Sequence, residues 1–136
     1  MNSFKLLWAI TGADRSIDSS QRGNIDNATL EQTMDCLREV LERSGLMELV
    51  VVDPPETGPR GLQLRTDAGC SIVTLAEVDS KKEKKIRTFR AGEEGEDVEI
   101  LGGKWNARMV CKDEDIVRQI FSELYSTQDV SRELLS

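Results

Sequence analysis

The sequence contains no histidine, and this absence excludes more chemistry than any other feature of its composition. Histidine is the commonest general base and the commonest metal ligand, so its absence removes the most frequent residue for either role. The three cysteines, Cys36, Cys70 and Cys111, are odd in number and widely spaced, which favours neither a disulfide framework nor a zinc motif. They are expected to be reduced, partly buried thiols. We therefore predict a protein that is not an enzyme and holds no metal or cofactor.

Long hydrophobic runs are also missing. No apolar stretch approaches the roughly 20 residues that span a bilayer. The apolar run Leu6–Ile10 has only five residues, which is short of the about 7–15 residues of a signal-peptide core. A first β-strand explains this run better than a signal peptide does. We therefore expect a cytoplasmic protein that does not contact membranes.

Charge is abundant but unbalanced, because 25 acidic residues face 18 Lys and Arg and leave a net charge of −7. Nucleic acid and anionic lipid attract cationic surfaces, so neither is an expected partner. The basic block at residues 81–90 contains Phe89 and could track a phosphate backbone, but the acidic block at 93–99 would repel phosphates. Charged edges resist β-aggregation, so the basic block is interpreted as a solvated strand edge with Ile86 and Phe89 supplying packing.

Hydrophobic periodicity predicts one strand and then one helix in the first third of the chain. Apolar side chains alternate over residues 4–10, which is typical of a strand with one buried face. Leucine and methionine then recur at spacings of four, three and four, which predicts a helix over residues 28–44. Asn27 is one candidate for its N-cap, and a capping box of Thr29 and Gln32 is the alternative.

The residues around this helix predict a loop and further strands. Residues 11–27 are polar and rich in turn formers, which predicts a loop. After the helix, short turns separate alternating or wholly apolar runs, so neighbouring strands are expected to pair antiparallel. The expected strands cover residues 46–53, 62–66, 70–78, 85–91, 97–101 and 104–111.

A second helix is expected over residues 114–126, with Asp113 as its N-cap. The closing residues are expected to dock through three apolar side chains, Val130, Leu134 and Leu135. The predicted fold class is α+β: a largely antiparallel twisted sheet of about six to seven strands with two main helices packed on one face. No linker or repeat divides the chain, so residues 1–136 are expected to form a single domain.

Acidic residues are the remaining candidates for site chemistry. Asp14, Asp18 and Asp26 lie in the first predicted loop, but their spacing does not match a calcium-binding EF-hand loop. Glu93 and Glu94 lie on a glycine-flanked turn, where adjacent carboxylates are normally solvated rather than catalytic. Neither group predicts metal binding or catalysis.

The C-terminal third, GGKWNARMVCKDEDIVRQIFSELYSTQDVSRELLS, resembles the tail of a group of small bacterial proteins. In that group a strand containing Trp or Tyr leads into a helix of the type D-x-x-x-V-x-x-x-F-x-E, and a G-D-V-S-x-E-L-L closure follows. Gln128 stands here where the group has glycine. The strand LLWAI, the following helix and the hairpin GLQLRTDAGCSIVTLAE are also similar. The matching tail residues are Asp113, Val117, Phe121, Glu123, Leu124, Tyr125, Asp129, Val130, Ser131, Glu133, Leu134 and Leu135.

The group is similar to immunity proteins of polymorphic toxin and interbacterial competition systems. The resemblance implies a protein that binds and neutralises a cognate bacterial toxin by covering its active site. We expect a toxin domain with a cationic cleft as the partner, because an acidic inhibitor can imitate a phosphate-bearing substrate and accelerate capture. Without toxin, a monomer or weak dimer is expected. The candidate toxin contacts are acidic loop residues, namely Asp14, Asp18, Glu93, Glu94, Glu96 and Asp97.

Two alternatives remain open. One is a non-enzymatic structural or adaptor protein that self-associates through a sheet edge. The other is an enzyme with an unrecognised carboxylate or cysteine site, which would require a deep pocket lined by several carboxylates. Trp8 and Trp105 are expected to pack in the core, whereas an exposed Trp would indicate an interface.

Overall fold

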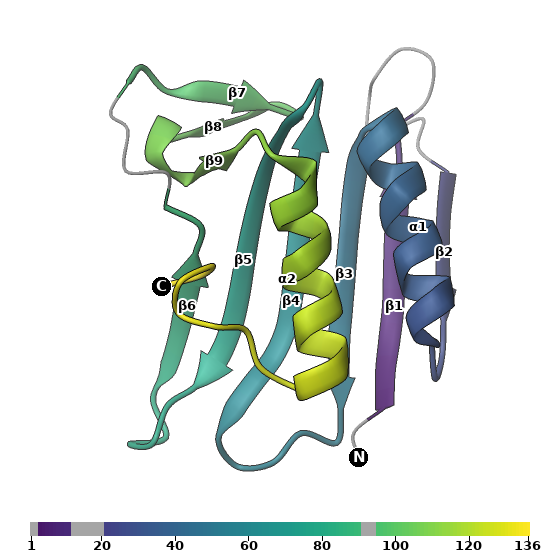
Figure 1. Cartoon of the computed structure of the whole chain (residues 1–136), viewed down its shortest axis with the longest axis vertical. Coiled ribbons are helices and arrows are strands. Elements are labelled where there is room, and N and C mark those ends of the chain that lie inside the picture. Colours follow the sequence, from purple (N-terminus) through teal and green to yellow (C-terminus); the bar gives the residue numbers. More distant parts are fainter. Residues whose placement is uncertain (1–2, 12–20, 91–94) are drawn as a thin grey trace.

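A computed structural model of the chain describes residues 3–11, 21–90 and 95–136. Within these residues, an antiparallel sheet carries two helices on one face (Figure 1). The helices are α1 (Leu30–Arg43) and α2 (Glu114–Thr127). The strands are β1 (Ser3–Ile10), β2 (Gln21–Ile25), β3 (Gly45–Val52), β4 (Gly58–Asp67), β5 (Cys70–Val78), β6 (Lys84–Thr88), β7 (Val98–Ile100), β8 (Gly103–Trp105) and β9 (Val110–Cys111).

The main sheet runs in the order β2-β1-β3-β4-β5-β6, and β9 also pairs with β5. Strands β7 and β8 form a separate two-stranded sheet. Each of these pairings is antiparallel. The short turns between successive strands explain this arrangement, because parallel neighbours need long crossovers. The α+β class predicted from the sequence is therefore confirmed.

The capping box that begins α1 is the alternative predicted from the sequence, and Asn27 is not the cap. The Thr29 hydroxyl accepts a hydrogen bond from the Gln32 amide N–H at 3.0 Å, and the Gln32 side chain accepts one from the Thr29 amide at 2.9 Å. These two bonds satisfy helix N–H groups that would otherwise lack partners. The buried stripe of α1 then faces the sheet through Thr33, Leu37, Val40 and Leu41.

Helix α2 begins at the predicted cap, since the Asp113 side chain accepts from the Asp115 amide at 2.9 Å. Its last turn contacts the residue before the N-cap of α1, since the Tyr125 hydroxyl donates to the Ala28 carbonyl at 2.8 Å. The Tyr125 ring also stacks on Phe4 of β1 with ring centroids 4.9 Å apart. Helix α2 is therefore held against β1 and the segment that leads into α1.

Two element predictions were wrong. Residues 11–27 were expected to form a loop, but β2 pairs with β1 along that stretch, with Leu6 opposite Ile25. The strand is short and polar and lacks an apolar pattern of its own, so it forms because β1 offers it hydrogen-bonding partners. The single strand expected over residues 104–111 is interrupted by the 3₁₀ turn Ala107–Met109, because the Asn106 side chain accepts from the Arg108 amide and caps that turn.

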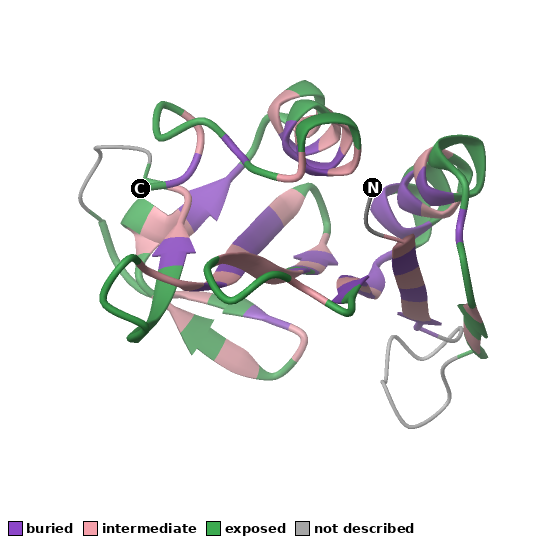
Figure 2. Ribbon diagram, turned by 90° about the horizontal axis from the view of Figure 1, so that it is seen from below, coloured by how far each residue is buried: buried purple, intermediate pink, exposed green. Residues whose placement is uncertain are grey.

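The main core lies between the sheet and the two helices, and Figure 2 shows both helices on the same side of the sheet. Trp8 packs against this core as a half-buried residue, while Trp105 belongs to a second, smaller cluster. The closing residues dock as predicted, with Val130 and Leu135 buried and Leu134 half-buried.

Candidate functional site

Two of the six acidic residues predicted to contact a toxin can be placed in the structure. Glu96 and Asp97 are exposed and lie immediately before β7. Together with Glu99 on β7, which is also exposed, they make no ion pair with another described residue. We call these three residues the acidic entry of the β7–β8 hairpin. The other predicted contacts lie outside the described residues, namely Asp14, Asp18, Glu93 and Glu94.

The β7–β8 hairpin holds this acidic entry against the sheet. Its two-residue turn, Leu101 and Gly102, has positive φ at both positions, 49° and 83°, as a tight hairpin turn of the I′ type requires. Ile100 is fully buried and packs in the second cluster with Ile72 of β5. Ile72 lies on the strand face opposite the neighbouring core residue Val73, so the hairpin covers part of the sheet face that the helices leave open.

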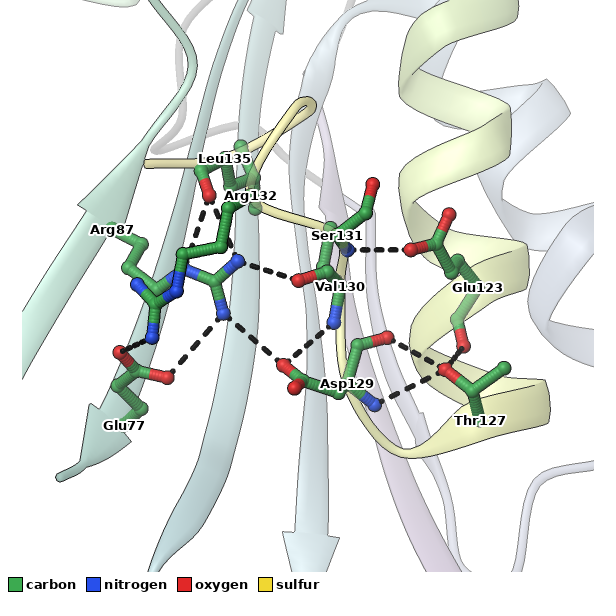
Figure 3. Close-up of polar contacts among 9 residues, drawn as sticks. All are labelled: Glu77, Arg87, Glu123, Thr127, Asp129, Val130, Ser131, Arg132 and Leu135. Atoms are coloured by element: carbon green, nitrogen blue, oxygen red, sulfur yellow. Dashed lines mark hydrogen bonds and ion pairs between the residues drawn. The ribbon is translucent and has the colours of Figure 1, made fainter. Parts of the chain in front are cut away.

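A buried arginine organises the C-terminal segment (Figure 3). Arg87 of β6 is only 3% exposed, and its Nη1 contacts the carboxylates of Glu77 at 3.4 Å and Asp129 at 3.1 Å. Its Nε and Nη2 donate to the Leu135 carbonyl at 3.1 and 2.8 Å. Nη2 also donates to the Val130 carbonyl. All three guanidinium nitrogens are thus occupied by groups of the chain itself, which assigns this Arg87 network a structural role.

The Arg87 network corrects the expectation for the basic block. Ile86 was predicted to supply packing, but it is 63% exposed, and the neighbouring Arg87 is buried instead. The cause is the register of β6, which places Arg87 opposite Leu75 and Ile86 opposite Ala76. Leu75 belongs to the helix-covered core, so Arg87 points inward and Ile86 points to the open face.

A groove of about 590 Å³ runs between α1 and strands β1 and β2 and contains carboxylates and a thiol. Asp35 pairs with Arg38 at 3.3 Å and Glu39 pairs with Arg43 at 3.0 Å, and both carboxylates are more than half exposed. Burial, with a smaller contribution from Glu39, raises the pKa of the Cys36 thiol to about 12. A thiol held in its protonated form is a poor nucleophile, so burial lowers the reactivity of Cys36.

The remaining cysteine and the arrangement of metal-ligating side chains complete the description of candidate chemical groups. Burial also raises the pKa of Cys111, although its hydrogen bond to the Asp113 carbonyl opposes the shift. No set of three or more His, Cys, Asp or Glu side chains in the described part of the chain is arranged to hold a metal ion. Across residues 3–11, 21–90 and 95–136, neither helix has the length and apolar character needed to cross a membrane.

The open sheet face carries a trough that runs across four strands. Cross-strand pairing places Val50, Gly61, Ala76 and Ile86 in one row, with each residue directly opposite the next. Glu48, Gln63 and Thr74 form the adjacent row in the same way. These two rows and Arg60 line a hollow of about 390 Å³, which we call the Gly61 trough.

Comparison with known proteins places the fold in a wider class. The fold is similar to that of the crystal structure of a hypothetical protein from Neisseria gonorrhoeae. The match has a TM-score of 0.77 at 13% sequence identity and covers 96% of this chain and 92% of that chain. A family model matches residues 7–134, so the chain belongs to DUF6911, a family of unknown function. No curated protein matches this sequence.

Sequence reasoning missed both the Arg87 network and the Gly61 trough. A signal for the first was present: Glu77 continues the inward alternation of Val73 and Leu75 on β5, and an acid at an inward position needs a buried partner. The trough has no comparable signal, because it depends on residues from four strands that only the sheet register brings together.

Proposed function

We propose that this chain is an immunity protein that binds a cognate bacterial toxin and covers its active site. The observation that carries the proposal is the acidic entry, where Glu96, Asp97 and Glu99 are exposed without an ion pair to another described residue. Carboxylates that are unpaired in the free protein are available to pair with Lys or Arg of a cationic cleft. The resemblance of the tail and the first strand to immunity proteins supports the same assignment.

The charge of the whole chain strengthens this argument. A net charge of −7 attracts a cationic partner at long range and raises the association rate. The β7–β8 hairpin fixes the entry residues to the protein body through buried Ile100, so less conformational freedom is lost when they dock. Asp14, Asp18, Glu93 and Glu94 remain part of the proposed contact surface.

Self-association through a sheet edge has less support. The β6 edge carries Lys84 and Lys85, and Ser136 already exchanges two backbone hydrogen bonds with Thr88 there. The opposite edge, β2, is only five residues long. Short edges, lysines and edges already covered by the chain all oppose pairing with a second sheet.

The test is the association rate with a toxin domain, to be sought in the product of the neighbouring open reading frame. Replacing two entry residues, E96Q/D97N, should slow association about two- to tenfold at low salt, because local charge steers the encounter. The matched control is E31Q/E42Q, which removes two exposed, unpaired acids from α1 and the same amount of charge. Equal slowing by both variants would refute the entry as the contact site. If the native chain neither bound the toxin domain nor protected cells from it, the immunity function itself would be wrong.

A further inference from the structure

We propose that the open sheet face, which α1 and α2 do not cover, binds an acidic segment of a partner protein. This inference goes beyond the proposed function, because it concerns a different part of the surface from the acidic entry. The partner segment also has the opposite charge to that of a cationic cleft. The inference stands whether or not the chain binds a toxin.

Strand register collects cations on the open face, because every second residue of a strand points to the same side of the sheet. Strands β1 to β6 contribute two acids to this face, Glu48 and Asp67. Even without Lys5, whose ammonium lies 3.9 Å from the Asp26 carboxylate, the cations outnumber these acids by four to two. The open face is thus positively charged on a chain of net charge −7. Its cations are Lys5, Arg22, Arg60, Arg65 and Lys84.

The two helices on the other side of the sheet carry the opposite charge. Helix α1 has four acids and two arginines, and α2 has three acids and one arginine. Each of these arginines lies within 3.3 Å of a carboxylate of its own helix. On the open face, by contrast, Arg65 and Lys84 make no ion pair with a described residue. An acidic partner is therefore attracted to the sheet side of the molecule rather than to the helices.

The open face also has the shape to hold an extended segment. Beside the Gly61 trough lies a second hollow of about 410 Å³, which Arg22 helps to line. Both hollows are lined by Glu48 and Gln63, so they form one groove, which we call the open-face groove. One end of the groove contains Arg22 and the other contains Arg60. The apolar residues at the Arg22 end are Leu7, Ala9 and Leu46.

The two ends of the groove specify the segment that fits it. Leu7 lies at one end, and Ile86, which is 63% exposed, lies at the other. Their strands are four places apart in the sheet, which corresponds to about 19 Å. Five residues of extended chain cover about 17 Å. A segment with two apolar residues about five positions apart would thus cover both ends, and an acid beside each would meet Arg22 and Arg60 with charge-assisted hydrogen bonds.

The acid in the middle of the groove favours a protein segment over other anions. Glu48 lies where the two hollows meet and repels any negative charge placed there. A polypeptide can leave its middle uncharged and carry its acids at the ends, whereas nucleic acid carries a phosphate at every step. A second copy of this chain is also disfavoured, because two chains of net charge −7 repel each other.

Capped peptides test the proposal by two-dimensional NMR of the intact chain. A peptide that joins Glu-Leu to Leu-Glu through four glycines should shift the amide resonances of Leu7, Leu46, Ala76 and Ile86. We expect a Kd on the order of 0.1–1 mM. Replacing both glutamates of the peptide by lysine, or both leucines by serine, should weaken binding at least about fivefold, because one change reverses the charge and the other removes the apolar contacts.

Variants of the chain separate local charge from total charge. R60Q/K84Q should raise the Kd of the acidic peptide at least about threefold, whereas R38Q/R118Q, which removes the same charge from the helices, should change it less than about 1.5-fold. E48Q should lower the Kd about twofold, because it removes the repelling acid. K84Q alone changes an exposed residue, so it should keep the thermal midpoint and still raise the Kd about twofold.

Several outcomes would overturn the proposal. They are shifts that map to the helices, equal binding of the lysine peptide, equal effects of the two double variants, and no shift at about 5 mM peptide. Equally tight binding of a thymidine trinucleotide would show that the groove recognises negative charge without selecting a protein segment. Sedimentation that shows a dimer which K84Q converts to a monomer would identify a second copy as the occupant instead.

Discussion

Replacing Arg87 by methionine tests whether burial, rather than the number of ionic contacts, makes an arginine stabilising in this protein. In R87M the Glu77 carboxylate, whose side chain is 10% exposed, loses its 3.4 Å ion pair, and the Val130 and Leu135 carbonyls lose their donor. Removing one partner of a buried pair costs about 3–5 kcal/mol. Arg132 also lies 3.5 Å from Glu77 and offsets part of the loss. We therefore expect the free energy of unfolding to fall by about 3 kcal/mol.

Arg118 provides the matched control. It also contacts two carboxylates, Glu114 at 3.3 Å and Asp115 at 3.1 Å, but its side chain is 38% exposed. Exposed pairs contribute about 0–1 kcal/mol, so R118M should lose less than about 1 kcal/mol. Urea unfolding followed by tryptophan fluorescence measures both variants, with unchanged m-values as the check on two-state behaviour. Equal losses in R87M and R118M would refute the reasoning from burial.

Two further predictions concern the first helix and the cysteines. T29A removes the capping hydroxyl and should lower the free energy of unfolding by about 1 kcal/mol. N27G changes a residue that has a φ of 52° and does not cap α1, so it should change the free energy of unfolding by less than about 0.5 kcal/mol. A larger loss for N27G would contradict the cap assignment. Because burial raises the pKa of Cys36 to about 12 and also raises that of Cys111, less thiolate is present at pH 8, so both should react with iodoacetamide more slowly in the native than in the urea-unfolded protein. Mass spectrometry of the labelled peptides measures this, and equal native and unfolded rates would show that neither thiol is protected.

Local chemistry made much of the fold predictable. Asp113 and the Thr29–Gln32 pair mark helix starts because their side chains satisfy backbone N–H groups within the next turn, an interaction contained in a few residues. The strand at residues 70–78 was predicted at its observed bounds, since turn formers flank a β-branched run. The antiparallel sheet followed from short connections.

Features that depend on distant strands could not be predicted in this way. The polar strand β2 exists because β1 offers it a partner, and no pattern within QRGNI reports that. Arg87 rather than Ile86 points into the interior because of the strand register, since a shift of one residue moves every side chain of a strand to the opposite face of the sheet. For the candidate site, Glu96 and Asp97 are exposed as expected of a polar turn, but the Gly61 trough needed the alignment of β3 to β6.

The C-terminal segment also bears on how long the protein stays folded. Arg87 bonds to a carbonyl 48 residues further along the chain, and Thr88 bonds to Ser136. Contacts between such distant residues must overcome the entropy of closing a long loop, so we expect them to form after the sheet and helices have assembled. Interactions that are absent from the folding transition state act on the unfolding rate and leave the folding rate nearly unchanged. The Arg87 network therefore governs the lifetime of the native state, and its loss should shorten that lifetime without delaying folding.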